Sequence, residues 1–274
     1  MKNIALGQYY PSDSCVHHLD GRVKLVLSIL FIISSFFCRS AVSFTFLLIG
    51  TLALVFISKI PLKIILRSVR GIVFILLFTF VINMFFTKGV GAPLFEWHFI
   101  ALYREGIWNA AFMALRILSL IVGSSIFMSY ATTPIELTDS LEGLLSPLKK
   151  IHVPVHEFAM MMSIALRFIP TLAEETDRIM SAQKARGADF STGSIVRRVK
   201  MLLPVLIPLF ASALRRADEL ATAMECRCYH GGDGRTCMNV PHIRLADIAA
   251  IVIAAAFGAS LLLLNMVKLG YVMK

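Results

Sequence analysis

Residues 41–58 read AVSFTFLLIGTLALVFIS and contain no charged side chain. A helix needs about 20 apolar residues to cross roughly 30 Å of hydrocarbon, and this stretch comes close to that length. Several other stretches share its character, and we expect spans at 23–38, 41–58, 71–87, 107–130 and 245–267. The first of these is short and needs some tilt or its flanking residues to cross. The sequence therefore predicts an all-α integral membrane protein with about five transmembrane helices.

The composition of the whole chain agrees with this prediction. Of its 274 residues, 57% are hydrophobic and only 16% are charged, whereas a soluble domain carries roughly 25% charged residues. The net charge of +10 would suggest nucleic-acid binding in a soluble protein. In a membrane protein such an excess of cations orients the chain instead, so we expect contact with the lipid bilayer and no nucleic-acid partner.

The positions of the cations along the chain predict its orientation. If the N-terminus is cytoplasmic, the predicted inside segments hold 21 of the 27 Lys and Arg residues, and the outside segments hold five. The short segment 59–70 alone carries four of them. Because positive residues are enriched in cytoplasmic loops, we expect a cytoplasmic N-terminus and a C-terminus on the outside.

The segment between the fourth and fifth predicted spans has a different pattern. Apolar residues recur there close to every 3.6 positions, which predicts long amphipathic helices at about 135–150, 153–186 and 195–229. We therefore divide the chain into three parts. They are an N-terminal membrane region at 1–130, a cytoplasmic region of amphipathic helices at 131–244, and a C-terminal transmembrane helix at 245–274.

The apolar sides of the two longer helices are candidates for contact with a partner. The residues that we single out are Met160, Met162, Leu166, Leu202, Leu206 and Leu209. Such stripes can lie on the membrane surface, form a core within their own chain, or contact another membrane protein. Methionine is adaptable, so this surface suits a sliding contact or several alternative partners.

The two longer helices end in similar motifs. Residues 182–187 read AQKARG and residues 223–228 read AMECRC, so both have the form Ala-x-x-small-Arg. Gly187 can adopt the left-handed conformation that closes a helix, which leaves Arg186 as a projecting planar cation. One basic residue at a helix end is usually only a partner for the helix dipole. Two such ends favour Arg186 and Arg227 as docking points for acidic or carbonyl-lined grooves.

In their order along the chain, these features resemble the transmembrane T component of energy-coupling factor (ECF) transporters, which are importers related to ABC transporters. The resemblance covers nearly the whole chain. Its motifs include Asp13-Ser14, His18-Leu19-Asp20, Leu115-Arg116, Thr132-Thr133-Pro134, Leu166-Arg167-Phe168-Ile169-Pro170, Ala185-Arg186-Gly187, Cys226-Arg227-Cys228 and Gly231-Gly232-Asp233-Gly234.

The resemblance implies a coupling subunit that is a multi-pass protein of a bacterial or archaeal cell membrane. Two cytoplasmic ABC-type ATPase subunits would hydrolyse ATP, and a membrane S component would capture a vitamin or metal ion for uptake. The T component would join them and would not itself be an enzyme. Its apolar helix faces would contact the S component, and each arginine-bearing helix end would dock one ATPase. The docking residues implied by position are Ala185, Arg186, Gly187, Cys226, Arg227 and Cys228.

The second motif departs from the family pattern, because Cys228 stands where the family has glycine. A residue with a Cβ disfavours the left-handed conformation. We therefore expect this helix to end one or two residues later, near Gly231 or Gly232.

An enzymatic reading finds no site in the sequence. His156-Glu157 begins like a zinc-protease helix, but Met160 occupies the position of the second ligand. The isolated carboxylates of Asp20 and Glu136 fit helix caps better than an acid and base pair. No phosphate-binding loop occurs, so we expect no catalytic residue and no cofactor.

A metal site and a secondary transporter are two further alternatives. Thiol and imidazole groups gather at Cys226, Cys228, His230, Cys237 and His242, but their spacing is not that of a zinc finger, and we expect no metal. A self-contained secondary transporter or other multi-span permease would show repeated halves and ionisable residues near the membrane midplane. Only Arg116 and Asn83 are candidates of that kind, which makes this the weaker reading.

Overall fold

The computed structural model describes residues 9–86, 95–97, 100–188, 194–231 and 244–266. The regular secondary structure of this part of the chain is helical except for a short antiparallel hairpin of β1 (Phe95–Trp97) and β2 (Ile100–Leu102). The predicted all-α membrane protein is thus confirmed, with the hairpin as an unpredicted addition. The chain forms two compact units. Each unit is described below by itself.

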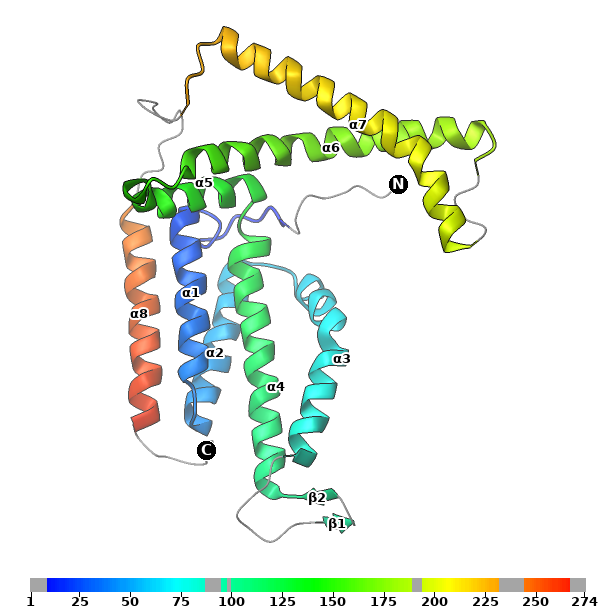
Figure 1. The fold of residues 1–274 in the computed structure, drawn as a ribbon. Coiled ribbons are helices and arrows are strands. Elements are labelled where there is room, and N and C mark those ends of the chain that lie inside the picture. The colour runs from blue at the N-terminus through cyan, green and yellow to red at the C-terminus, as the bar shows by residue number, and fades with distance from the viewer. Residues whose placement is uncertain (1–8, 87–94, 98–99, 189–193, 232–243, 267–274) are drawn as a thin grey trace. The chain divides into compact units, whose positions relative to one another are not determined.

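The first unit is a bundle of long apolar helices (Figure 1). Its elements are α1 (Gly21–Phe37), α2 (Ala41–Ser58), α3 (Leu62–Phe86), α4 (Arg104–Ser125) with the π-helical turn η1 (Ile126–Tyr130), the first turns of α5 (Pro134–Leu145), and α8 (Leu245–Met266). α1 packs against α8 and α4, while α3 packs mainly against α4. Two clusters of buried apolar side chains form the core, one centred on Ile126 and the other on Leu47.

Glycines allow the closest helix contacts in this bundle. A Cβ built on Gly123 of α4 would lie 2.2 Å from the ring of Phe31 in α1, and one on Gly50 of α2 would lie 2.5 Å from the ring of Phe257 in α8. Small residues at helix contacts are typical of membrane bundles, because packing rather than water exclusion holds the helices together.

Four helices are long and apolar enough to cross a membrane. They are Ala41–Ser58, Leu62–Phe86, Arg104–Tyr130 and Leu245–Asn265. The remaining predicted span, 23–38, corresponds to α1, which has 17 residues and carries the cations Arg22 and Lys24 in its first turn. At 1.5 Å per residue α1 is about 25 Å long, so it is shorter than the hydrocarbon layer.

The third predicted span begins earlier than expected. We predicted a loop up to Arg70, but α3 already begins at Leu62, directly after Pro61. Lys63, Arg67 and Arg70 are four and three positions apart, so they share one side of a helix and do not interrupt it. Proline is well tolerated at a helix start. The charged segment is therefore the first part of α3.

Buried polar contacts hold the helix starts of the bundle together. Lys24 is 1% exposed, and its Nζ donates to the carbonyl of Ala131 and to Oε1 of Glu136, both at 2.9 Å. Glu136 also forms a capping box with Thr133, whose Oγ1 accepts from the N–H of Glu136 at 3.2 Å. The start of α5 is therefore fixed to α1 by an ion pair.

A second contact of this kind joins α8 to α1. The carboxylate of Asp247, 2% exposed, accepts from the N–H of Asp20 at 3.0 Å and from the N–H of Arg244 at 2.7 Å. Asp20 in turn caps α1 by accepting from the N–H of Arg22 at 2.9 Å. The capping roles predicted for Asp20 and Glu136 are both confirmed.

The second unit holds the end of α5, the 3-10 turn η2 (Ser146–Ile151), α6 (Val155–Ala185) and α7 (Ile195–Cys226). These elements agree within a few residues with the predicted amphipathic helices. α6 continues through Pro170, and α7 continues through Pro204 and Pro208. α7 bends in its first half, where its prolines lie (Figure 1).

Candidate coupling surface

The first arginine-bearing helix end is closed by a glycine. α6 ends one residue before Arg186, and Gly187 follows with a left-handed φ of 89°. The N–H of Gly187 donates to the carbonyl of Lys184 at 2.9 Å, and the N–H of Ala188 donates to that of Gln183 at 3.0 Å. These two bonds define a Schellman motif, which satisfies carbonyls that the helix end would otherwise leave free.

The second arginine-bearing helix end has the same geometry. α7 ends one residue before Arg227, and Cys228 follows with a left-handed φ of 57°. The N–H of Cys228 donates to the carbonyl of Glu225 at 2.9 Å, and the N–H of Tyr229 donates to that of Met224 at 3.1 Å. Each bond matches one at the end of α6, so the two motifs are built alike.

The prediction that this helix would end near Gly231 or Gly232 is wrong. The left-handed position is Cys228 itself, even though a Cβ there costs roughly 1–2 kcal/mol. The two capping hydrogen bonds offset that cost. Gly231 is also left-handed, with φ of 99°, but it lies beyond the helix end, and Gly232 is outside the described residues.

Both motifs are open to a partner. Every residue of the two triplets is exposed, namely Ala185, Arg186, Gly187, Cys226, Arg227 and Cys228. An exposed guanidinium presents five donors in a rigid fork that fits carboxylates or carbonyl groups. The structure thus provides two similar cationic tips, each held by a closed helix end.

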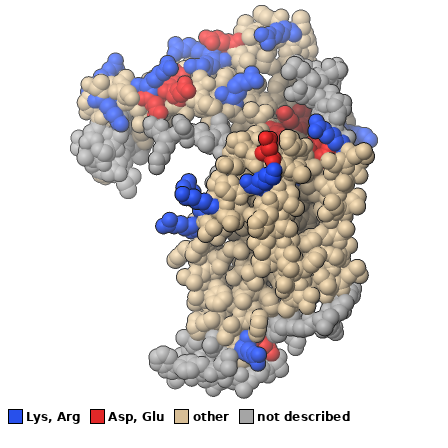
Figure 2. All heavy atoms as spheres, turned by 180° about the vertical axis from the view of Figure 1, so that it is seen from behind, with Lys and Arg blue, Asp and Glu red and all other residues tan. Residues whose placement is uncertain are grey.

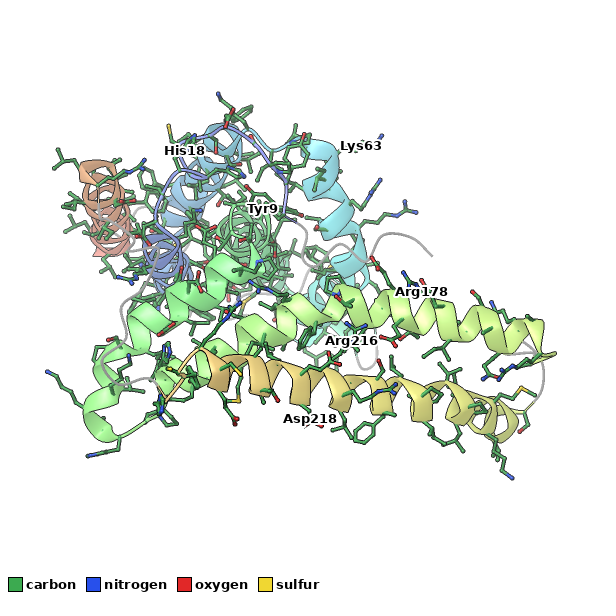
Figure 3. All side chains as sticks on the ribbon, turned by 90° about the horizontal axis from the view of Figure 1, so that it is seen from above. Tyr9, His18, Lys63, Arg178, Arg216 and Asp218 are labelled. Atoms are coloured by element: carbon green, nitrogen blue, oxygen red, sulfur yellow. The ribbon has the colours of Figure 1, made fainter. Side chains whose placement is uncertain are left out.

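A polar clamp joins α6 and α7 (Figure 3). Glu175 of α6 accepts from the hydroxyl of Ser212 at 2.7 Å and from the guanidinium of Arg216 at 3.0 Å, both on α7. The hydroxyl of Ser212 and the guanidinium of Arg216 hold the pKa of Glu175 below its usual value. Figure 3 shows Arg216 between the two helices, whereas Asp218 points away from α6.

The clamp lies at equivalent positions of the two helices. Glu175 is eleven residues before Arg186, and Arg216 is eleven residues before Arg227. The helices run in opposite directions, so their arginine-bearing ends lie at opposite ends of the pair (Figure 1). At 1.5 Å per residue, eleven residues on each side place the two tips about 30 Å apart.

The predicted apolar residues of α6 occupy different environments. Met162 is 40% exposed, while Met160 and Leu166 are half-buried. The exposed apolar stripe of this helix consists of Phe158, Met161, Met162, Ala165 and Ile169. Phe158 belongs to the apolar pattern of this helix in the sequence but was not singled out as a partner contact. Counting three, four, seven and eleven positions onward from it gives the stripe.

α7 carries a similar exposed stripe between Leu203 and Leu214. Leu202 and Leu206 are exposed, the latter by 54%, whereas Leu209 is half-buried. The stripe consists of Leu203, Leu206, Ile207, Phe210 and Leu214. Val205, which lies between these positions in the sequence, is buried, so the helix has a separate inner side. Apolar surface of this extent on long helices is typical of a contact site for another protein or for lipid.

The residues of the rejected enzymatic reading have a structural role. Nδ1 of His156 lies 2.8 Å from Oε1 of Glu142, which joins the start of α6 to α5. Cys228 and His230 are exposed, and a ring nitrogen of His230 contacts the carbonyl of Cys228 at 2.9 Å. Cys237 and His242 lie outside the described residues. Among the residues that the structure describes, no group of three or more His, Cys, Asp or Glu side chains could hold a metal ion.

Polar residues inside the spans bind the backbone. The guanidinium of Arg116 donates to the carbonyl of Cys38 and lies 5.1 Å from the ring centre of Phe44. The amide of Asn83 donates to the carbonyl of Thr79 one turn earlier, at 2.8 Å. Arg116 therefore binds the polar end of α1, which lies in the hairpin between α1 and α2. Both side chains thus have backbone partners within the described residues.

Comparison with known proteins agrees with this arrangement of membrane bundle and paired helices. The chain belongs to the family described as "Cobalt transport protein" (CbiQ), whose sequence pattern matches residues 12–238. That stretch includes both arginine-bearing helix ends. The class defined here is thus a transport protein of the membrane, which is not a class of enzymes.

The similar proteins narrow this class. The chain is 50% identical to the energy-coupling factor transporter transmembrane protein EcfT of Clostridium kluyveri, over 91% of this chain and 92% of that protein. It is 50% identical to EcfT of Acidaminococcus fermentans, over 94% and 95% of the two chains, and 44% identical to EcfT of Bacillus subtilis, over 86% and 88%. The chain is the transmembrane component of an ECF transporter, and thus a multi-pass protein of the cell membrane.

Proposed function

We propose that this chain couples ATP hydrolysis in two ABC-type ATPase subunits to substrate uptake by a membrane S component. The observation that carries the proposal is the pair of arginine tips. They have the same cap geometry, they are exposed, and they lie at opposite ends of two clamped helices. Two similar tips suit two similar partners, such as a pair of ATPases.

The clamp allows the two helices to transmit movement. Because Glu175 and Arg216 join the helices at equal distances from the tips, a displacement of one tip turns its helix about the clamp. The paired helices can therefore pass a movement of the ATPases to whatever contacts their apolar stripes. We place the S component on these stripes, to which Met162 of α6 and Leu206 of α7 belong. The other residues singled out from the sequence lie outside the stripes, namely Met160, Leu166, Leu202 and Leu209. The transported substrate is a vitamin or a metal ion.

The proposal includes an orientation. The region 131–244 is cytoplasmic, the N-terminus is inside and the C-terminus is outside. The cations Arg22, Lys24, Lys59 and Lys63 lie near the helix ends that this orientation makes cytoplasmic. In the described part of the opposite end, the cations are Arg39 and Arg104. This asymmetry supports the orientation through the preference of basic residues for the cytoplasmic side.

Charge reversal at the tips tests ATPase docking. The double variant Arg186→Glu and Arg227→Glu is expected to lose both ATPases during affinity purification in mild detergent, because truncating or reversing a buried charge contact costs about 2–5 kcal/mol. The matched control is Arg178→Glu with Arg215→Glu, which reverses two exposed arginines away from the tips on the same helices. Retention of both ATPases by the tip variant at wild-type stoichiometry would contradict the proposal.

A charge on the apolar stripes tests contact with the S component. Met162→Asp or Leu206→Asp is expected to release the S component and stop uptake while the ATPases stay bound, because an unpaired charge is costly in an apolar contact. Ser181→Asp, at an exposed position of α6, serves as the control. Val205→Asp places the same charge at a buried position of α7 and should instead destabilise the helix pair. Loss of both partners from the stripe variants would show that these side chains form an internal core.

A further inference from the structure

The rotation of α3 about its axis is fixed at its first turns. Ile65 is buried in the bundle core, and Val69, one turn later, packs against the same cluster. Between them, the hydroxyl of Ser68 lies 2.5 Å from the hydroxyl of Tyr130. These contacts define the inner side of the helix, so the side that faces away from the bundle is also fixed.

The outer side of α3 begins with three cations. Lys63, Arg67 and Arg70 are all exposed, and their spacing of four and three positions places them in one row. Figure 3 shows Lys63 pointing away from the bundle, and Figure 2 shows basic side chains projecting from this part of it. The sequence from 59 to 87 contains no acidic residue. Among the described residues, no carboxylate forms an ion pair with any of the three.

The same row continues as an apolar surface. Phe74 is 78% exposed and Leu77 is 59% exposed, and both lie on the side of the cations. Val81 follows in the same row and is also exposed. One side of the helix thus carries a cationic stretch from Lys63 to Arg70, about 10 Å between its first and last residue, followed by an apolar stretch. This order of a charged part and an apolar part matches that of a phospholipid, whose charged headgroup is joined to apolar chains.

We propose that this side of α3 binds an acidic phospholipid, with the headgroup phosphate on Lys63, Arg67 and Arg70 and the acyl chains along Phe74 and Leu77. The two guanidinium groups can each bind phosphate oxygens in a bidentate manner. In a zwitterionic lipid, the cation of the headgroup offsets the negative charge of the phosphate and weakens its attraction to the three basic residues. The excess of three cations over nearby acids favours a lipid with net negative charge. Under the orientation of the proposed function, this lipid lies in the cytoplasmic leaflet.

Lipid retention by the full-length chain tests this site. The protein, purified in a mild detergent, is incubated with phosphatidylglycerol or phosphatidylcholine of identical acyl chains, and bound lipid is measured by native mass spectrometry. We expect retention of phosphatidylglycerol to exceed that of phosphatidylcholine by about tenfold or more, since each cation near an anionic lipid contributes about fivefold. The triple variant Lys63→Gln, Arg67→Gln and Arg70→Gln should lose this preference.

A matched variant separates the site from the overall charge. Replacing Lys149, Lys150 and Arg178 by Gln removes three exposed cations elsewhere and should leave the preference unchanged. The single variants Arg67→Gln and Arg70→Gln, each expected to lose about fivefold, keep the test decisive if the triple variant does not fold. Because the measurement is made in detergent, it does not depend on the orientation or on the proposed coupling role.

Several outcomes would overturn the proposal. They are equal retention of the two lipids by the wild-type chain, an unchanged preference in the triple variant, or an equal loss in the matched variant. The purified transporter complex allows one more test, in which the subunits retained by the triple variant are identified. If the triple variant loses a protein subunit there while its lipid preference stays intact, the outer side of α3 is a protein contact and the lipid assignment is wrong.

Discussion

Replacing Cys228 by glycine is expected to stabilise the end of α7. Cys228 has a left-handed φ of 57°, which costs a residue with a Cβ roughly 1–2 kcal/mol. Glycine removes this strain but loses more entropy on folding, by about 0.4–1 kcal/mol. The net gain is therefore about 1 kcal/mol, which changes the local opening equilibrium about fivefold.

Hydrogen exchange measures this change directly. The amides of Cys228 and Tyr229 donate the two capping hydrogen bonds, so peptides that contain them should exchange about fivefold more slowly in the Cys228→Gly variant. The reciprocal variant Gly187→Cys introduces the same strain at the end of α6, where φ is 89°, and should accelerate exchange at Gly187 and Ala188 by a similar factor.

The pair of variants also contains its own control, because each leaves the other helix end unchanged. If Gly187→Cys has no effect on exchange, the left-handed position carries no strain, and the energetic argument fails. If Cys228→Gly accelerates exchange, the thiol makes a stabilising contact that the geometry does not account for. In either case the two helix ends would not be equivalent.

Two further predictions concern the clamp and the orientation. Because the pKa of Glu175 is lowered in the folded chain, the clamp stabilises the helix pair above the ordinary carboxyl pKa of 4.5 and loses this contribution as the pH falls through the lower, folded value. The hydrogen-exchange protection of α6 and α7, corrected for the pH dependence of intrinsic exchange, should therefore fall in this acidic range in the wild type. Glu175→Gln should remove the clamp's pH dependence, while Glu174→Gln preserves it. For the orientation, a cysteine at Arg104 should react with an impermeant thiol reagent added to intact cells, and one at Lys150 only after the membrane is opened, in a chain whose exposed cysteines are replaced by serine. The opposite labelling pattern would reverse the orientation.

The sequence predicted the features that depend on local pattern. The span at 41–58 coincides with α2 because length and apolarity are properties of one segment. The end of α6 at Ala185 was also found from a short motif. The start of α3 was misplaced, because three cations in a row were taken as a loop, although their spacing also fits one side of a helix.

Features that join distant segments could not be predicted from the sequence. The clamp joins Glu175 to Arg216, 41 residues away, and nothing local marks either residue as a partner of the other. The left-handed Cys228 was missed for another reason, because intrinsic preference was weighed without the hydrogen bonds that overcome it. Likewise, the contact of Arg116 with the carbonyl of Cys38 requires the packing of α4 against α1.

The ion pair between Lys24 and Glu136 has a consequence for biosynthesis. The two residues are 112 positions apart, so the ribosome releases Lys24 long before its partner has been made. A lysine without a partner is costly in an apolar environment, so during this interval the start of α1 has to stay hydrated at the membrane surface. The N–H of Asp20 lacks its acceptor for longer still, since Asp247 is synthesised 227 positions later. The first membrane helix to be synthesised is thus among the last to reach its final depth.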